Sequence, residues 1–105
     1  MLEGFDFSTD EVHTWEIEAI WHAIDVGTLA FSRHAAQELS LDGLHQEDVL
    51  DAISFYDEVS KDLPDNAPGR APGINFDRHL ETVTVRAKVG WNQGGYYIVI
   101  TVMAN

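Results

Sequence analysis

The sequence contains no cysteine, few basic residues and no long apolar run. The absence of cysteine excludes disulfides and thiolate metal sites, and it suits a reducing compartment. No stretch approaches the roughly 18 apolar residues that a membrane span requires. The N-terminal segment MLEGFDFSTDEV has no basic region followed by an apolar one. We therefore expect no signal peptide, and a cytoplasmic protein without membrane contact.

Basic side chains are scarce and unevenly placed. Six Lys and Arg stand against eighteen Asp and Glu, which gives a net charge of −12. Residues 1–69 contain two basic and sixteen acidic side chains, a balance of −14, whereas residues 70–105 contain four basic and two acidic ones, a balance of +2. Nucleic-acid binding draws most of its affinity from neutralised phosphates. We therefore expect the molecule as a whole to repel RNA, and any RNA contact to involve the C-terminal third.

The remaining composition indicates a folded chain. Hydrophobic residues make up 45% of the 105 positions, which is enough for one modest core. All three prolines lie within residues 62–73, so this segment is predicted to be a loop. We predict one domain over residues 1–105.

Short helices are predicted in the first half of the chain. Residues 8–11 read S-T-D-E, the form of a capping box, and the apolar residues that follow recur at helical spacing up to Gly27. A second helix is expected to begin at an N-cap Ser32 and to extend to about residue 39. A third is expected over about 46–55.

The last third of the chain indicates sheet and completes a predicted α+β fold, with N-terminal helices packed on one face of a small C-terminal antiparallel sheet. Apolar and polar residues alternate over residues 82–91, and Asn92–Gly95 forms a hairpin connection to YYIVITVM. Pairing Trp91 with Tyr96 places apolar residues opposite one another along both strands. Shorter strands are expected at 56–60 and 74–76.

The sheet face away from the helices is the first candidate site. An arginine fork and a lysine point charge beside hydroxyl groups suit a phosphate. Arg78 and His79 stand at the turn before the strand and add two donors. The alternative is an ordinary solvated face, since an antiparallel sheet commonly carries such residues toward water. The residues that this pairing puts on the open face are Thr84, Arg86, Lys88, Tyr97 and Thr101.

His34 is the second candidate. It stands in the first turn of the second helix, where the helix dipole favours the neutral imidazole. A neutral base beside Arg33 could take a 2′-hydroxyl proton in RNA cleavage, a role worth about 10²–10⁴-fold in rate. The alternative is a structural histidine that packs its ring or bonds a loop carbonyl.

The first helix offers one arrangement that resembles a metal site. Glu18, His22 and Asp25 stand at i, i+4 and i+7 and supply oxygen and nitrogen ligands. No second ligand set at a diagnostic spacing accompanies them. A solvated acidic stripe is the other interpretation, and we predict neither a metal nor a cofactor.

From Phe31 onward the order of short motifs resembles a bacterial family, the domain-of-unknown-function family 4258. Its members read S-x-H-A and then G-I-S-x-E-D-V, and this chain has Ser32-x-His34-Ala35, Gly43-Leu44 and Glu47-Asp48-Val49, with a final strand ending Ile100-Thr101-Val102. The resemblance implies the compact α+β fold of the RelE and BrnT toxins, which are small ribonucleases. It further implies a toxin-like core over residues 31–105 and an added acidic helical extension over residues 1–30.

Two functions remain open at this point. The first is a RelE/BrnT-like endoribonuclease toxin, inactive or held in check by the acidic helix at residues 8–26, which would cover the cationic sheet face. The resemblance places His34 and Thr101 at motif-like positions, and the strand pattern adds the cations. The catalytic residues would be His34, Arg86 and Thr101, and the substrate-binding residues Lys88, Arg78, His79 and Tyr97.

The second function is a non-catalytic acidic binding protein, such as an immunity-type or antitoxin-like inhibitor of a basic protein partner. The same negative charge motivates this interpretation, in which the acidic side chains face a basic partner and do not cover the sheet. A homodimeric module is a third interpretation, in which Trp15, Trp21 and Trp91 supply the contact surface.

Overall fold

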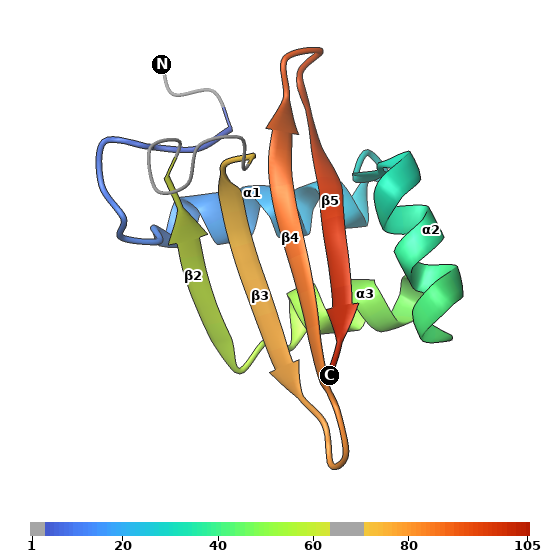
Figure 1. Cartoon of the computed structure of the whole chain (residues 1–105). Coiled ribbons are helices and arrows are strands. Elements are labelled where there is room, and N and C mark those ends of the chain that lie inside the picture. The colour runs from blue at the N-terminus through green and yellow to red at the C-terminus, as the bar shows by residue number, and fades with distance from the viewer. Residues whose placement is uncertain (1–3, 64–70) are drawn as a thin grey trace.

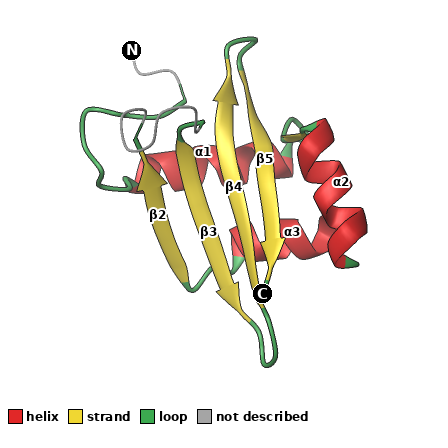
Figure 2. Ribbon diagram, in the orientation of Figure 1, coloured by secondary structure: helices red, strands yellow, loops and turns green. Residues whose placement is uncertain are grey.

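Helices and sheet form two layers in the computed structural model, which describes residues 4–63 and 71–105. The α+β fold is confirmed, because α1 and α3 lie against one face of the sheet and α2 lies beside β5 at its edge (Figures 1 and 2). No helix in these two ranges is long and apolar enough to cross a bilayer. The helices are α1 (Thr14–Asp25), α2 (Arg33–Asp42) and α3 (Gln46–Ser54), and the strands are β1 (Ala30–Phe31), β2 (Glu58–Asp62), β3 (Gly73–His79), β4 (Thr84–Asn92) and β5 (Tyr96–Ala104).

The sheet has the strand order β1-β5-β4-β3-β2. Strands β2 to β5 pair antiparallel in chain order, and β1 alone pairs parallel, with β5. The alternation of apolar and polar residues predicted the antiparallel strands of the sheet. It did not predict β1, because two residues are too few to show a period. The strands expected at 56–60 and 74–76 are displaced or longer in the structure, where they are β2 and β3.

The core lies between the helices and the sheet. Ile20 of α1 and Ile53 of α3 are fully buried there, together with Phe76 of β3 and Val99 of β5. Helix α1 therefore belongs to the same core as the rest of the chain. The expectation that it covers the cationic face was wrong, because its apolar stripe buries it on the opposite face of the sheet (Figure 1).

The predicted start of α2 is confirmed, whereas the predicted start of α1 is wrong. Ser32 is the N-cap of α2, as predicted, and its Oγ accepts the backbone N–H of Ala35 at 3.0 Å. The capping box predicted at residues 8–11 was wrong, since α1 begins at Thr14 after an N-cap His13. Glu16 closes that turn by accepting the His13 backbone N–H at 2.8 Å. Ser8 instead donates both its backbone N–H and its hydroxyl to Asp6.

A buried ion pair fastens the N-terminal segment to the sheet. Nζ of Lys61, on β2, lies 2.9 Å from Oε1 of Glu16, and both side chains are 0% exposed. Lys61 also donates to the Asp6 carbonyl at 2.7 Å, and the Asp6 backbone N–H donates to Glu16 Oε2 at 2.9 Å. Because the charges are paired and further hydrogen-bonded, they can remain buried.

The register of the β4–β5 hairpin differs from the predicted one. Trp91 pairs with Tyr97 and Asn92 with Tyr96, so the connection has three residues and ends at Gly95, whose φ is 97°. A bulge follows, because Val89 pairs with Val99 whereas Lys88 pairs with Thr101. Ile100 is the extra residue. The pairing is thus displaced by one residue near the turn and by two beyond the bulge.

Helix α2 completes the edge that β1 leaves open. The Ser32 backbone N–H donates to the Val99 carbonyl at 2.9 Å, and Ser32 Oγ donates to the carbonyl of the bulged Ile100 at 3.1 Å. Further along, the Val102 N–H donates to Glu38 Oε1 at 2.9 Å. Side chains of α2 therefore satisfy backbone groups that an edge strand would otherwise leave unpaired.

Candidate functional site on the open sheet face

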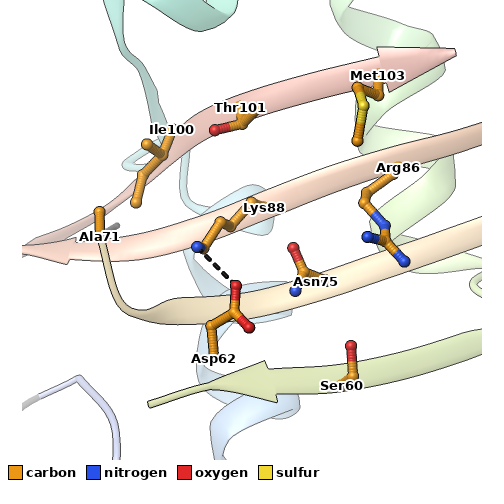
Figure 3. Close-up of a pocket in the computed structure, with 9 residues that line it drawn as sticks. All are labelled: Ser60, Asp62, Ala71, Asn75, Arg86, Lys88, Ile100, Thr101 and Met103. Atoms are coloured by element: carbon orange, nitrogen blue, oxygen red, sulfur yellow. Dashed lines mark hydrogen bonds and ion pairs between the residues drawn. The ribbon is translucent and has the colours of Figure 1, made fainter. Parts of the chain in front are cut away.

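A hollow of about 330 Å³ lies on the face of the sheet that the helices leave open (Figure 3). Three of the predicted site residues line it together: Arg86 and Lys88 of β4 and Thr101 of β5. The bulge allows Ile100 to line it as well as Thr101, since these neighbours would otherwise face opposite sides. The described residues that line it are Ser60, Asp62, Ala71, Asn75, Arg86, Lys88, Ile100, Thr101 and Met103.

Arg86 is bound by a carboxylate at the edge of the hollow. Its Nε donates to Asp77 Oδ1 at 2.6 Å and its second terminal nitrogen donates to Asp77 Oδ2 at 2.8 Å, which is the bidentate geometry of a strong pair. These hydrogen bonds lower the pKa of Asp77 below its ordinary value, against the opposing effect of burial. They also raise the pKa of Arg86. Both groups are therefore charged at neutral pH.

Lys88 is bound in the same way on the other side. Its Nζ donates to Asp62 Oδ2 at 2.8 Å, the contact drawn as a dashed line in Figure 3. The side chains are 9% and 18% exposed respectively. Among the described residues, the hollow is lined by Arg86 and Lys88, each paired with a carboxylate, and by the uncharged polar groups of Ser60, Asn75 and Thr101.

This arrangement limits the chemistry of the hollow. An anion that binds Arg86 or Lys88 must compete with the carboxylate already paired with each cation, which weakens the attraction of these two side chains for phosphate. No histidine is among the described residues that line the hollow. Among the residues described, no group of three His, Asp or Glu side chains is arranged to hold a metal ion. The set of Glu18, His22 and Asp25 on α1 is therefore not arranged as a metal site.

His34 does not line the hollow. It is 66% exposed on α2, and its Nε2 lies 3.4 Å from Glu38 Oε1. Helix α2 lies beside the β5 edge, where the Ser32 hydrogen bonds hold it. The order of the motifs brought His34 and Thr101 into neighbouring elements without bringing their side chains into one site.

Tyr97 lies on the other face of the sheet, which corrects its predicted position. The displaced register places it beside Trp91 in the core, with a ring-centroid distance of 4.8 Å. Its hydroxyl donates to the Gly4 carbonyl at 2.7 Å, and its ring packs against Phe5 at 5.3 Å. Burial, assisted by the charge of Glu16, raises the pKa of Tyr97 to about 12.

Arg78 and His79 also lie outside the hollow. Arg78 is on the helix side, where its guanidinium carbon lies 5.7 Å from the Phe55 ring centroid and a terminal nitrogen lies 3.9 Å from Asp51. His79 is on the open face at the end of the sheet, with its Nε2 2.7 Å from Glu58 Oε2 and its Nδ1 2.9 Å from Thr84 Oγ1. Thr84 therefore forms part of a separate cluster.

Sequence reasoning missed the carboxylates that neutralise the hollow. A signal for Asp77 was present, because Asn75, Asp77 and His79 alternate with apolar or helix-facing residues along β3. Recognising that alternation would have extended the predicted strand to residue 79. No comparable signal marked Ile100, since a bulge in a run of apolar residues leaves the pattern unchanged.

The outer surface of the helical layer carries charge differently. Helices α1 and α3 contain no Lys or Arg. Glu18 and Asp25 of α1 and Glu47 of α3 are exposed and have no ion pair in the described part of the chain. Trp15 and Trp21 are 38% and 37% exposed, whereas Trp91 packs against the core.

The fold and site define an α+β protein with a mixed, mostly antiparallel sheet, helices against one face, and on the other face a hollow lined by the paired cations Arg86 and Lys88. No family model, curated protein or solved structure matches the chain. The resemblance to domain-of-unknown-function family 4258 and to RelE-like toxins therefore stays a prediction.

Proposed function

We propose that this chain is a non-catalytic binding protein for a basic protein partner, comparable in role to an immunity protein or an antitoxin. The observation that carries the proposal is the distribution of unpaired charge. On the open face, Arg86 and Lys88 are neutralised by Asp77 and Asp62. On the outer helical layer, α1 and α3 present acidic side chains with no Lys or Arg among them. Such a surface attracts a basic protein and speeds its association.

Capture followed by reconstitution tests this proposal. The full chain, immobilised at low ionic strength, is expected to retain a basic protein that is released as the Debye length shortens to about 3 Å near 1 M salt. The two purified components should then form a complex, and the partner's activity should fall when the complex forms. Retention of no basic protein at low salt would contradict the proposal.

An endoribonuclease is the second candidate, and one observation favours it. Arg86, Lys88 and Thr101 share the hollow, so a phosphate that displaced Asp77 and Asp62 would meet both cations. The test is cleavage of a labelled RNA by the full chain and by its Arg86→Met variant. Cleavage that disappears in the variant would replace the binding proposal. Truncation is unsuitable here, because Ile17 and Ile20 belong to the core.

A further inference from the structure

The groove between α1 and α3 is the place where a basic partner would make its most specific contact. We infer that this groove binds a lysine or arginine side chain from a basic segment of the partner, with apolar residues of that segment on either side. The inference rests on the proposed function and names the surface that performs it.

The groove is lined by Trp21, Ile24, Asp25 and Ser54 and has a volume of about 270 Å³. Its aromatic wall is fixed in place, since Trp21 Nε1 donates to the Ile53 carbonyl at 3.0 Å. The Tyr56 ring lies behind it, 6.5 Å away between centroids. A held indole that is still 37% exposed is a ready surface for a guanidinium or ammonium group.

The electrostatics of the groove favour a cation. Helix α1 ends at Asp25 and α3 ends at Ser54, and both end residues line the groove. The negative end of the α1 dipole therefore lies beside the Asp25 carboxylate at the groove. Helices commonly carry Lys or Arg in their last turn, whereas α1 has only His22 there and α3 has no basic residue. Asp25 has no hydrogen bond or ion pair within residues 4–63 and 71–105, so its charge is available to a partner.

Exposed apolar side chains follow both helix ends. Val26 comes directly after Asp25 and is 55% exposed. Phe55 comes directly after Ser54 and is 66% exposed, with the Arg78 guanidinium carbon 5.7 Å from its ring centroid. An acidic groove whose lining residues Asp25 and Ser54 are each followed by an exposed apolar side chain suits a protein segment that alternates basic and apolar residues. RNA and anionic lipid lack the cation that this groove requires, and the acidic helices would repel both.

Binding of a defined peptide to matched variants tests the inference. The probe is a synthetic peptide of alternating arginine and leucine, with a glutamate–leucine peptide as the control ligand. The groove variant is Asp25→Lys. The matched control is Asp42→Lys, which changes the net charge equally at an exposed position outside the groove. Circular dichroism melts verify that both variants fold, and Asp25→Asn supplies a milder second variant.

The expected result is a local effect. The dissociation constant of the arginine peptide should rise at least about tenfold in the groove variant and no more than about twofold in the control. Asp25→Asn should raise it by an intermediate factor. The Trp21 indole N–H signal, identified by its absence in Trp21→Phe, should shift on peptide addition to the unsubstituted chain.

Two results would overturn the inference while leaving the proposed function intact. One is an equal loss of affinity in Asp25→Lys and Asp42→Lys, which would show diffuse attraction to the acidic surface. The other is no peptide binding by a chain that still retains a basic protein in the capture experiment. Failure of the proposed function is distinguished from both, because it requires that no basic protein is retained.

Discussion

The two faces of the sheet hold their charges under different conditions. On the helix-covered face, Glu16 and Lys61 form a pair whose side chains are completely buried. On the open face, Arg86 is 43% exposed in its pair with Asp77, although Asp77 itself is only 11% exposed. A buried pair has a large desolvation cost, and losing one partner leaves an uncompensated charge. A pair that reaches water loses less, because solvent screens the charge that remains.

The buried ion pair stabilises the fold, whereas the exposed acidic side chains of the helices are available to contact another molecule. The Glu16–Lys61 pair links α1, β2 and the segment around Asp6, so it acts as a fastening within the fold. The pairs on the open face neutralise cations that would otherwise attract phosphate. The outer helical layer differs from both, because Glu18 and Asp25 lack such pairs in the described part of the structure. Acidic side chains that have no ion pair within the protein are available to form ion pairs with a partner protein.

The largest expected effect comes from breaking the buried pair. Lys61→Met should lower the free energy of unfolding by about 3–5 kcal/mol, because Glu16 would remain buried without its cation. Urea denaturation measures the change. The double variant Glu16→Gln/Lys61→Met should recover part of the loss, since it removes both charges. A loss below about 1 kcal/mol for the single variant would mean that water reaches Glu16.

Much of the fold could be predicted because its signals are local. The Ser32 cap, the glycine that follows α1 and the alternation along β4 each depend on a few neighbouring residues. The hairpin register could not be predicted in this way. It depends on a three-residue turn and a bulge at Ile100, and an apolar run such as YYIVITVM fits several pairings equally well.

The candidate site was harder to predict for the same reason. Arg86 and Lys88 share a face by alternation alone, so their convergence was predicted. The neutralising residues Asp62 and Asp77 come from β2 and β3, and locating them required the order and register of the whole sheet. His34 failed to join the site because α2 docks beside β5, a tertiary arrangement that no local pattern specifies.

The next largest effect is expected at Ser32, which connects α2 to β5. Ser32→Ala should lower the free energy of unfolding by about 1–2 kcal/mol, because the α2 cap is lost. The Ile100 carbonyl loses its Ser32 donor in the same variant, which adds to the cost. Ser40→Ala, at an exposed position of the same helix, is the matched control and should change stability by less than about 0.5 kcal/mol. Equal effects in thermal melts of the two variants would contradict the capping role.

A smaller effect is expected from the open-face pair, and it depends on pH. The folded pKa of Asp77 lies below its ordinary value of 3.8, so the pair contributes stability above that value and loses it as the pH falls through the folded pKa. Arg86→Met should lower stability by about 1 kcal/mol or less at pH 7, since Arg86 is partly exposed.

Denaturation at a series of pH values checks this sign. The stability of Arg86→Met should fall less steeply than that of the unsubstituted chain as the pH drops below 3.8. Part of the slope should remain in both proteins, because hydrogen bonds from Ser8 lower the pKa of Asp6 to about 2. Identical slopes would show that Arg86 does not lower the pKa of Asp77.

The smallest expected change in stability has the opposite sign. Asp25 stands at the C-terminal end of α1, where a negative charge faces the negative end of the helix dipole. Asp25→Lys should therefore raise the free energy of unfolding by about 0.3–1 kcal/mol. The same variant should bind a basic partner more weakly. A residue that reduces stability where it stands and strengthens binding is the signature of a recognition site. A variant that is less stable than the unsubstituted chain would show instead that Asp25 has a structural role within the fold.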